Sequence, residues 1–202
     1  MLSRLRLVGI DDGFFPPEYK ELKLKTVLVG TLYRGRRPVD VKLRTVTVDG
    51  TDGTKKAIEI LESLGESDAV FLDGVTVAGF NVVDPEVLLS LSKSVVVIYK
   101  FEPNIERIER ALKLRFSDWR FRYDIILKAY SRSSFVRTKW KTMRIAVFGD
   151  SSVEAERLIS YTQLVSSIPE PLRASDIIAS AISRNPALLS KISSEQPTSS
   201  QP

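Results

Sequence analysis

The chain has 202 residues, of which 43% are apolar and 27% are charged, with ten glycines and ten prolines. This is the composition of a globular protein, and a core of this size needs no disulfide or metal to hold it together. Cysteine and histidine are both absent, which excludes thiol nucleophiles, Ser-His-Asp triads and Cys/His zinc sites, so any metal must be held by oxygen atoms. No apolar run approaches the roughly 20 residues that span a bilayer. We expect a cytoplasmic protein without a membrane partner, and its oligomeric state, a monomer included, stays open.

The net charge of +5 is unevenly distributed along the chain. Residues 100–144 contain thirteen Lys or Arg against five acidic residues, together with eight of the seventeen aromatic residues. Basic side chains interleaved with aromatic ones can contact phosphates and stack on bases, which indicates DNA or RNA as the partner. The alternative is a pair of amphipathic helices with solvated basic faces. The candidate phosphate-binding residues are Lys139, Lys141 and Arg144, or the cluster at 107–122.

The first part of the chain predicts three strands, at 5–10, 26–34 and 39–48, the last two joined by a tight link that contains Gly35. Three consecutive strands indicate an antiparallel meander. A helix follows at 54–64, because its apolar residues recur on one face, with Asp52 or Thr54 available as N-cap and Gly65 as its stop.

The apolar runs at 69–72 and 94–99 are typical of central parallel strands. A short helix that opens at Asp84-Pro85 joins them into a compact βαβ unit. Further on, helices are predicted at about 103–114 and 117–130, a last strand at 144–148, a helix from Ser151 onward and a final helix near 174–183. The predicted fold class is therefore α/β, a mixed sheet with an antiparallel three-strand meander plus parallel strands, flanked by helices. We expect a single domain over 1–185 and a disordered C-terminal tail over 186–202, where Ser, Gln and Pro dominate.

Predicted strands end in carboxylates at three places. Asp11-Asp12 ends the first strand, Asp49 and Asp52 follow the third, and Asp73 ends the strand at 69–72. In a meander with a later parallel strand, these ends lie on one edge of the sheet. Carboxylates without a Lys or Arg between them repel unless a cation neutralises them, and Mg²⁺ or Mn²⁺ suits an all-oxygen site. The alternative is that these are turn-forming and capping residues.

Two loops follow these acidic strand ends. Residues 74–81 form an apolar loop that is bracketed by glycines and ends in Phe80 and Asn81, where it could approach a substrate or act only as a connector. Phe14 and Phe15, stiffened by two prolines, could form a stacking wedge or pack on the core. We take these four residues as candidate contacts to nucleic acid.

An ordered set of segments carries a family resemblance. LVGIDDG (7–13), TVDGTDGT (47–54), VFLDGVTVAGFNVVD (70–84) and VVVIYK (95–100) resemble an uncharacterised family of archaeal proteins related to endonuclease V. The later segment AVFGDSSVEAERLISYTQLVSSIPEPLRASDIIAS (146–180) is similar to the C-terminal part of endonuclease V. The resemblance covers roughly residues 5–183.

The resemblance implies a ribonuclease-H-like fold and a divalent-metal nuclease with Mg²⁺ or Mn²⁺ as cofactor. It implies that Asp11 and Asp73 bind metal and that Lys100 contacts the scissile phosphate or positions the nucleophilic water. Asp49 or Asp52 would stand for the third acid, which is a helical Glu in endonuclease V. Asp150 sits where endonuclease V carries a His and would be a further ligand or base. The Pro-Tyr-Ile-Pro wedge of endonuclease V has no counterpart before Asp49, and its Gly-His-Gly is replaced by Gly-Val-Thr-Val-Ala-Gly.

The resulting hypothesis is an enzyme of DNA repair, a metal-dependent endonuclease that hydrolyses a phosphodiester near a deaminated base such as deoxyuridine or deoxyinosine. Its alternatives are a ribonuclease that acts on structured or modified RNA, and a nucleic-acid-binding module without catalysis. A phosphohydrolase of small esters is a third alternative, for which the basic segment would be superfluous.

Overall fold

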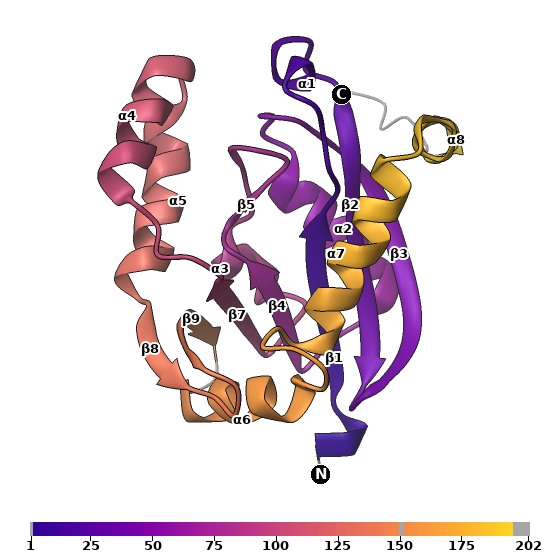
Figure 1. Cartoon of the computed structure of the whole chain (residues 1–202), viewed down its shortest axis with the longest axis vertical. Coiled ribbons are helices and arrows are strands. Elements are labelled where there is room, and N and C mark those ends of the chain that lie inside the picture. The colour runs from indigo at the N-terminus through magenta and orange to yellow at the C-terminus, as the bar shows by residue number, and fades with distance from the viewer. Residues whose placement is uncertain (1, 150–151, 196–202) are drawn as a thin grey trace.

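The computed structural model of the chain describes residues 2–149 and 152–195, and within them one main sheet carries the fold (Figure 1). Its strands lie in the order β3-β2-β1-β4-β7-β9-β8. They are β1 (Arg6–Asp12), β2 (Lys25–Arg34), β3 (Arg37–Thr47), β4 (Ala69–Asp73), β7 (Ser94–Tyr99), β8 (Ser134–Arg137) and β9 (Thr142–Gly149). The predicted α/β class with a mixed sheet is confirmed.

The first three strands form the predicted antiparallel meander, since β1 pairs antiparallel with β2 and β2 with β3. On its other side β1 pairs parallel with β4, and β4 pairs parallel with β7. The chain passes from β4 to β7 through α3 (Pro85–Leu88), which is the predicted βαβ unit. The carboxyl ends of β1, β4 and β7 therefore meet at one edge of the sheet.

Helices cover both faces of the sheet. On one face α7 (Glu170–Ser183) lies across β1 and β2, and α6 (Ser152–Thr162) packs beside it (Figure 1). On the other face pack α2 (Gly53–Leu64), α3 and the paired helices α4 (Ile105–Arg115) and α5 (Trp119–Ser131). Alternate residues of β4 fill the two cores, Val70 and Leu72 on the α2 side and Ala69 and Phe71 on the α6 side. Burial on both faces explains the continuous apolar runs of the central strands.

Helix α7 comes close to β1 because Gly9 has no side chain. A Cβ atom at Gly9 would lie 2.2 Å from the backbone carbonyl carbon of Pro171. One turn further along α7, the buried Ser175 donates its hydroxyl to the carbonyl oxygen of Gly9 at 2.8 Å. This contact joins segments 166 residues apart and fixes α7 on the strand that carries Asp11 and Asp12 at its end.

Some elements differ from those expected. The segment 74–81, expected as an irregular loop, contains a hairpin of β5 (Thr76–Val77) and β6 (Asn81–Val82). Strand β8 precedes the strand predicted at 144–148. A 3-10 turn at Leu2–Arg4 and α1 (Glu18–Glu21) add to the predicted elements. None of the helices in the described part of the chain is long and apolar enough to cross a membrane.

The C-terminal segment also corrects an expectation. Residues 186–202 were expected to be disordered, but residues 186–195 form α8 (Pro186–Glu195). The helix is anchored by Leu189, which is buried in a small core with Val27 and Val29 of β2 and Ala179 of α7. The polar composition of the segment did not predict this helix, because the helix is stabilised by contacts of Leu189 with residues of β2 that are far away in the sequence. The rest of the tail, 196–202, lies outside the described residues.

Candidate active site

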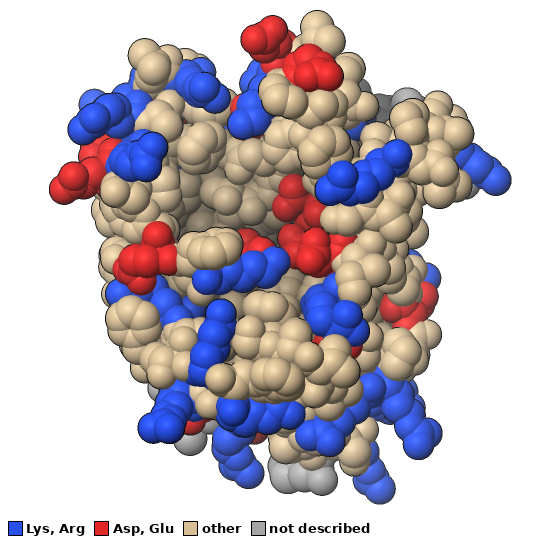
Figure 2. Space-filling view, viewed as in Figure 1, with Lys and Arg blue, Asp and Glu red and all other residues tan. Residues whose placement is uncertain are grey.

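Two carboxylates meet at the carboxyl edge of the sheet, as the sequence predicts. Ile10 of β1 lies opposite Leu72 of β4 in the parallel register, so that Asp11 and Asp73 follow at the same level. They line a hollow of about 460 Å³, together with Asp12, Gly74, Thr76, Ala78, Gly79 and residues 98–103. Figure 2 shows a hollow on this face of the molecule, with acidic atoms gathered along one wall and basic atoms at its rim.

Asp12 is a third carboxylate of this hollow. Its Oδ2 accepts a hydrogen bond of 2.9 Å from the backbone N–H of Ala78, and its own N–H donates to Oδ1 of Asp11 at 2.9 Å. The sequence shows Asp12 next to Asp11, but strand alternation assigns the two residues to opposite faces. The side chain reaches the hollow because β1 ends there and the β5–β6 hairpin folds over it.

Lys100 lies between the carboxylates. It follows directly after β7, and its Nζ atom lies 2.5 Å from Oδ2 of Asp73 and 3.9 Å from Oδ2 of Asp11. The structure thus brings Lys100 together with both aspartates that the resemblance named. Its ammonium is a local counter-charge for a strongly acidic site.

The charges in this hollow are not balanced. Burial raises the pKa of Asp11 well above its usual range, and the charges of Asp12 and Asp73 add to the rise. Burial also raises the pKa of Asp12 to about 6. Burial raises the pKa of Asp73 as well, although its hydrogen bond and ion pair with Lys100 oppose the change. Burial lowers the pKa of Lys100, but its contacts with Asp73 and Asp11 outweigh this, so that the pKa of Lys100 is raised.

A fourth carboxylate, Asp176 on α7, acts on the same groups. Its charge adds to the raised pKa of Asp73, behind burial, and it also favours the charged form of Lys100. Asp176 was not among the residues predicted from the sequence. The available signal was helical spacing, since Asp176 is four residues after Leu172 and next to Ser175, both of which are fully buried against the sheet.

The proposed third acids, Asp49 and Asp52, are not among the residues that line the acidic hollow. Asp49 is 4% exposed, its Oδ1 accepts from the backbone N–H of Phe80 at 2.8 Å, and it lines a neighbouring hollow. Asp52 precedes α2 but makes no capping bond there. Its carboxylate accepts from the side chains of Thr47 at 3.0 Å and Asn81 at 2.6 Å. Both carboxylates hold the β5–β6 hairpin against the end of β3, whereas Asp12 lines the acidic hollow.

Asn81, expected to read an exposed base, is fully buried. Its Oδ1 accepts from the N–H of Gly53 at 2.8 Å, and its Nδ2 donates to the carbonyl oxygen of Thr47 and to Asp52. All of its polar atoms are used inside the fold. Asn81 therefore joins the hairpin to the first turn of α2 and is not available to a substrate.

The candidate stacking residues have different environments. Phe14 is 46% exposed, with the guanidinium of Arg184 at 4.6 Å from its ring centroid. Phe15 is half-buried and packs against the core. Phe80 is half-buried in an edge-to-face contact with Phe116, with centroids 5.9 Å apart. Phe14 is thus the most accessible of the three candidates, although it does not line the acidic hollow.

The candidate phosphate-binding residues also separate into exposed and internal groups. Lys139 and Lys141 are exposed, whereas Arg144 is half-buried and donates to Glu102 at 2.8 Å. In the 107–122 cluster, Arg122 is only 3% exposed and donates to a carboxylate and to backbone carbonyls inside the fold. Arg122 is a structural residue and is excluded from phosphate contact. Asp150, the other candidate ligand, lies outside the described residues.

The donor chemistry of the hollow suits a hard divalent cation. The acidic groups present only oxygen atoms, and they outnumber the single ammonium that faces them. In the described residues, no group of three or more acidic side chains is already drawn together tightly enough to hold a metal ion. The Lys100 ammonium contacts Asp73 and Asp11 there instead.

Comparison with known proteins places the chain among archaeal relatives. The sequence model of the family described as endonuclease dU matches residues 3–183. A UPF0215 protein of Methanothermobacter thermautotrophicus is 40% identical over 188 residues, which cover 89% of this chain and 88% of that protein. A UPF0215 protein of Thermococcus sibiricus is 37% identical over 183 residues, covering 89% and 92%.

Solved structures extend the comparison. A crystal structure of a protein of unknown function from Archaeoglobus fulgidus superimposes with a TM-score of 0.74 at 27% identity, covering 88% of this chain and 98% of that one. Human ENDOV gives 0.56 at 18% identity, covering 91% and 86%. Endonuclease V of Ciona intestinalis, in complex with a DNA that contains an inosine followed by a ribo-adenosine, gives 0.52 at 13%, covering 93% and 87%.

The likeness to endonuclease V confirms the ribonuclease-H-like fold that the sequence motifs implied. The family match spans most of the chain, including β1, β4 and β7 with their acidic ends and α7 with Asp176. The chain is a member of the endonuclease dU family.

Proposed function

We propose that the protein is a divalent-metal-dependent endonuclease that hydrolyses a phosphodiester bond in DNA beside a deaminated base such as deoxyuridine or deoxyinosine. The observation that carries the proposal is the crowding of Asp11, Asp12 and Asp73 in one hollow at the carboxyl edge of a ribonuclease-H-like sheet. Membership of the endonuclease dU family supports the activity and its substrate class.

Asp11, Asp12 and Asp73 are the residues that would hold Mg²⁺ or Mn²⁺, with Asp176 close enough to contribute its charge. The unbalanced carboxylates fit such an ion, since burial makes their charged forms unfavourable without one. When bound, a divalent ion lowers the pKa of a bound water and stabilises charge on the leaving oxygen of a phosphodiester.

Lys100 becomes available to a substrate when a bound cation neutralises Asp11 and Asp73. It stands at the rim of the hollow with 28% of its side chain exposed. Released from Asp73, the ammonium can donate hydrogen bonds to the scissile phosphate and offset its developing charge. The backbone of Gly79 at φ 88° lies in the same wall, and its missing side chain leaves room for the Asp49 carboxylate, whose Oδ1 a Cβ atom there would meet at 2.3 Å.

The test is nicking of oligonucleotides that carry deoxyuridine, deoxyinosine or only normal bases, with Mg²⁺, Mn²⁺ or EDTA. An RNA arm separates the ribonuclease alternative. We expect metal-dependent nicking of the deaminated DNA, and a loss of at least about 100-fold in Asp11→Asn and Asp73→Asn, because each change removes a ligand charge. Asp124→Asn, an exposed aspartate on α5, is the matched control that should cut normally.

The outcomes separate the candidates. Cleavage that persists in EDTA or in both active-site variants would contradict the assigned site. Binding without cleavage of any arm would favour the binding-module alternative. Cleavage of RNA alone would replace DNA by RNA as the substrate.

A further inference from the structure

A row of three side chains crosses the sheet beside the acidic hollow. In the strand registers, Tyr99 of β7 lies opposite Arg144 of β9, and Arg144 lies opposite Phe135 of β8. The guanidinium carbon of Arg144 lies 4.4 Å from the ring centroid of Phe135 and 4.9 Å from that of Tyr130 on α5. Such stacked cation–π contacts hold the rings and the guanidinium in a fixed layer.

Hydrogen bonds fix the guanidinium of Arg144 further. Its Nε donates to Glu102 at 2.8 Å, and its Nη1 donates to the hydroxyl of Ser133 at 2.9 Å. Tyr130 donates its hydroxyl to the other carboxylate oxygen of Glu102 at 2.8 Å. The layer is therefore ordered before any partner arrives, which lowers the entropy cost of binding on it.

Large aromatic faces are nevertheless left open here. Phe101 is 86% exposed and Phe135 is 62% exposed. Both line a groove of about 460 Å³, with Tyr99, Lys100, Glu102, Lys141, Thr142, Met143 and Arg144. Residues 99–102 line this groove and the acidic hollow alike, so the two depressions adjoin each other. We call this depression the aromatic groove.

The charge of the aromatic groove favours a polyanion. Its lining contains the cations of Lys100, Lys141 and Arg144 against the carboxylate of Glu102, which Arg144 and Tyr130 already occupy. Basic atoms lie below the acidic hollow in Figure 2 as well. A surface that pairs open aromatic rings with cations suits bases and phosphates together.

We propose that the aromatic groove binds a single-stranded DNA segment that continues from the scissile bond in the acidic hollow. Unpaired bases stack on Phe101 and Phe135, and phosphates contact Lys141 and the outward side of Arg144. A paired duplex keeps its base faces inside its own stack, whereas every unpaired base offers a face to an exposed ring. The proposal rests on the proposed nuclease function for its scissile bond, but the groove itself is tested without cleavage.

The experiment measures the Kd of a fluorescein-labelled twelve-residue oligothymidine by anisotropy, in EDTA. Loss of one stacked base corresponds to a Kd about 5- to 150-fold higher. We expect Phe101→Ala and Phe135→Ala to weaken binding by at least about fivefold, and Phe135→Trp to retain it. Phe121→Ala is the matched control, since Phe121 is 54% exposed on α5 and lines neither depression.

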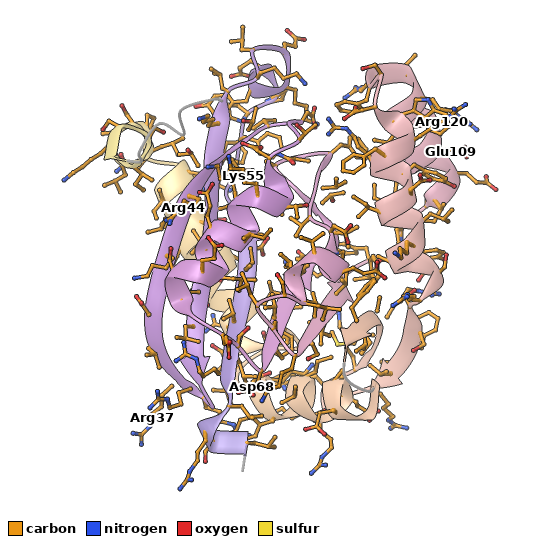
Figure 3. All side chains as sticks on the ribbon, turned by 180° about the vertical axis from the view of Figure 1, so that it is seen from behind. Arg37, Arg44, Lys55, Asp68, Glu109 and Arg120 are labelled. Atoms are coloured by element: carbon orange, nitrogen blue, oxygen red, sulfur yellow. The ribbon has the colours of Figure 1, made fainter. Side chains whose placement is uncertain are left out.

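Salt dependence tests the phosphate contacts. Removing one contacting cation from a single-strand complex reduces the slope of log K against log salt by about 0.7. We expect this reduction in Lys141→Ala. Lys55→Ala, on α2 at the back of the molecule (Figure 3), should leave the slope unchanged. Thermal unfolding of each variant confirms that the fold is retained.

The proposal is overturned if Phe101→Ala and Phe135→Ala bind like the wild type, or if Phe121→Ala loses as much affinity. It is also overturned if a duplex of the same length binds as tightly and is weakened equally, or if Phe135→Ala only converts a dimer into a monomer in sedimentation. A wild type that binds through these residues but nicks no substrate supports the aromatic groove and refutes the nuclease. A wild type that nicks its substrate, with binding unchanged in the variants, supports the nuclease and refutes the aromatic groove.

Discussion

Replacing Asp12 by Asn should stabilise the metal-free protein at neutral pH. The raised pKa of Asp12 means that the folded state disfavours its charged form, chiefly because the side chain is buried at the end of β1. An asparagine of the same shape removes the charge, and its Oδ1 can still accept the hydrogen bond from the N–H of Ala78. The change thus isolates the electrostatic cost of a carboxylate in this hollow.

The size of this stabilisation and the pH range in which it appears follow from the pKa of Asp12. A rise from 3.8 to about 6 corresponds to about 3 kcal/mol against the charged form. Because Asp12 keeps some contact with solvent, we expect Asp12→Asn to be more stable by about 1–3 kcal/mol at pH 8 in EDTA. As pH falls through about 6, Asp12 becomes protonated in the folded wild type before it does in the unfolded chain, so the stability of the wild type rises relative to the variant. Below about pH 3.8 Asp12 is protonated in both the folded and the unfolded state, and the difference from the variant disappears.

Urea unfolding at pH 8, 5 and 3.5 measures this difference, with Asp124→Asn as the exposed control on α5. At pH 8, Mn²⁺ should stabilise the wild type more than Asp12→Asn, because a ligand that binds only the folded state raises its stability. A variant that is less stable at pH 8, or a difference that does not change with pH, would refute the electrostatic reasoning.

Two further variants test buried side chains whose hydrogen bonds hold the segments around the site together. Asn81→Ala should lower the free energy of unfolding by about 2–4 kcal/mol, because the N–H of Gly53 and the carboxylate of Asp52 lose their hydrogen bonds to the buried Asn81 side chain. Urea unfolding measures this difference, and a loss below about 1 kcal/mol would contradict the structural role of Asn81. Arg122→Ala should cost about 3–5 kcal/mol, since it leaves the carbonyl oxygens of Gly50 and Phe80 without their buried donor as well as removing the cation that binds Asp118. The exposed Arg110→Ala on α4 should change stability by less than about 0.5 kcal/mol in the same assay, and equal losses in the two arginine variants would be inconsistent with the assignment of Arg122.

The sequence predicted the part of the site that depends on strand order. Asp11 and Asp73 could be paired from sequence because each ends an apolar run, and a later strand reached through a helix can lie parallel to the first, with its end at the same edge. The role expected of Lys100 followed from the family resemblance, in which this residue comes directly after an apolar strand. These residues depend on local periodicity and topology, which single-sequence patterns contain.

The rest of the site depends on side-chain contacts between distant segments. Asp49 and Asn81 have the residue types of a ligand and a base reader, but the β5–β6 hairpin buries both. Each strand of the hairpin has only two residues, which is too short for an alternating pattern of apolar residues to predict it. Asp176 belongs to α7, which reaches the site only because Gly9 allows it to lie close to β1.

The close approach of α7 to Gly9 also has a consequence for synthesis of the protein. The two partners of the Ser175 to Gly9 hydrogen bond are 166 residues apart, and chains grow at about 5–20 residues per second, so β1 waits roughly 8 to 33 s for its covering helix. During that time Leu7 and Phe71, which end fully buried, lack the cover of α7 and its residue Leu172. The nascent chain therefore presents an apolar sheet face while it is still on the ribosome, and a chaperone that shields this face should raise the yield of native protein.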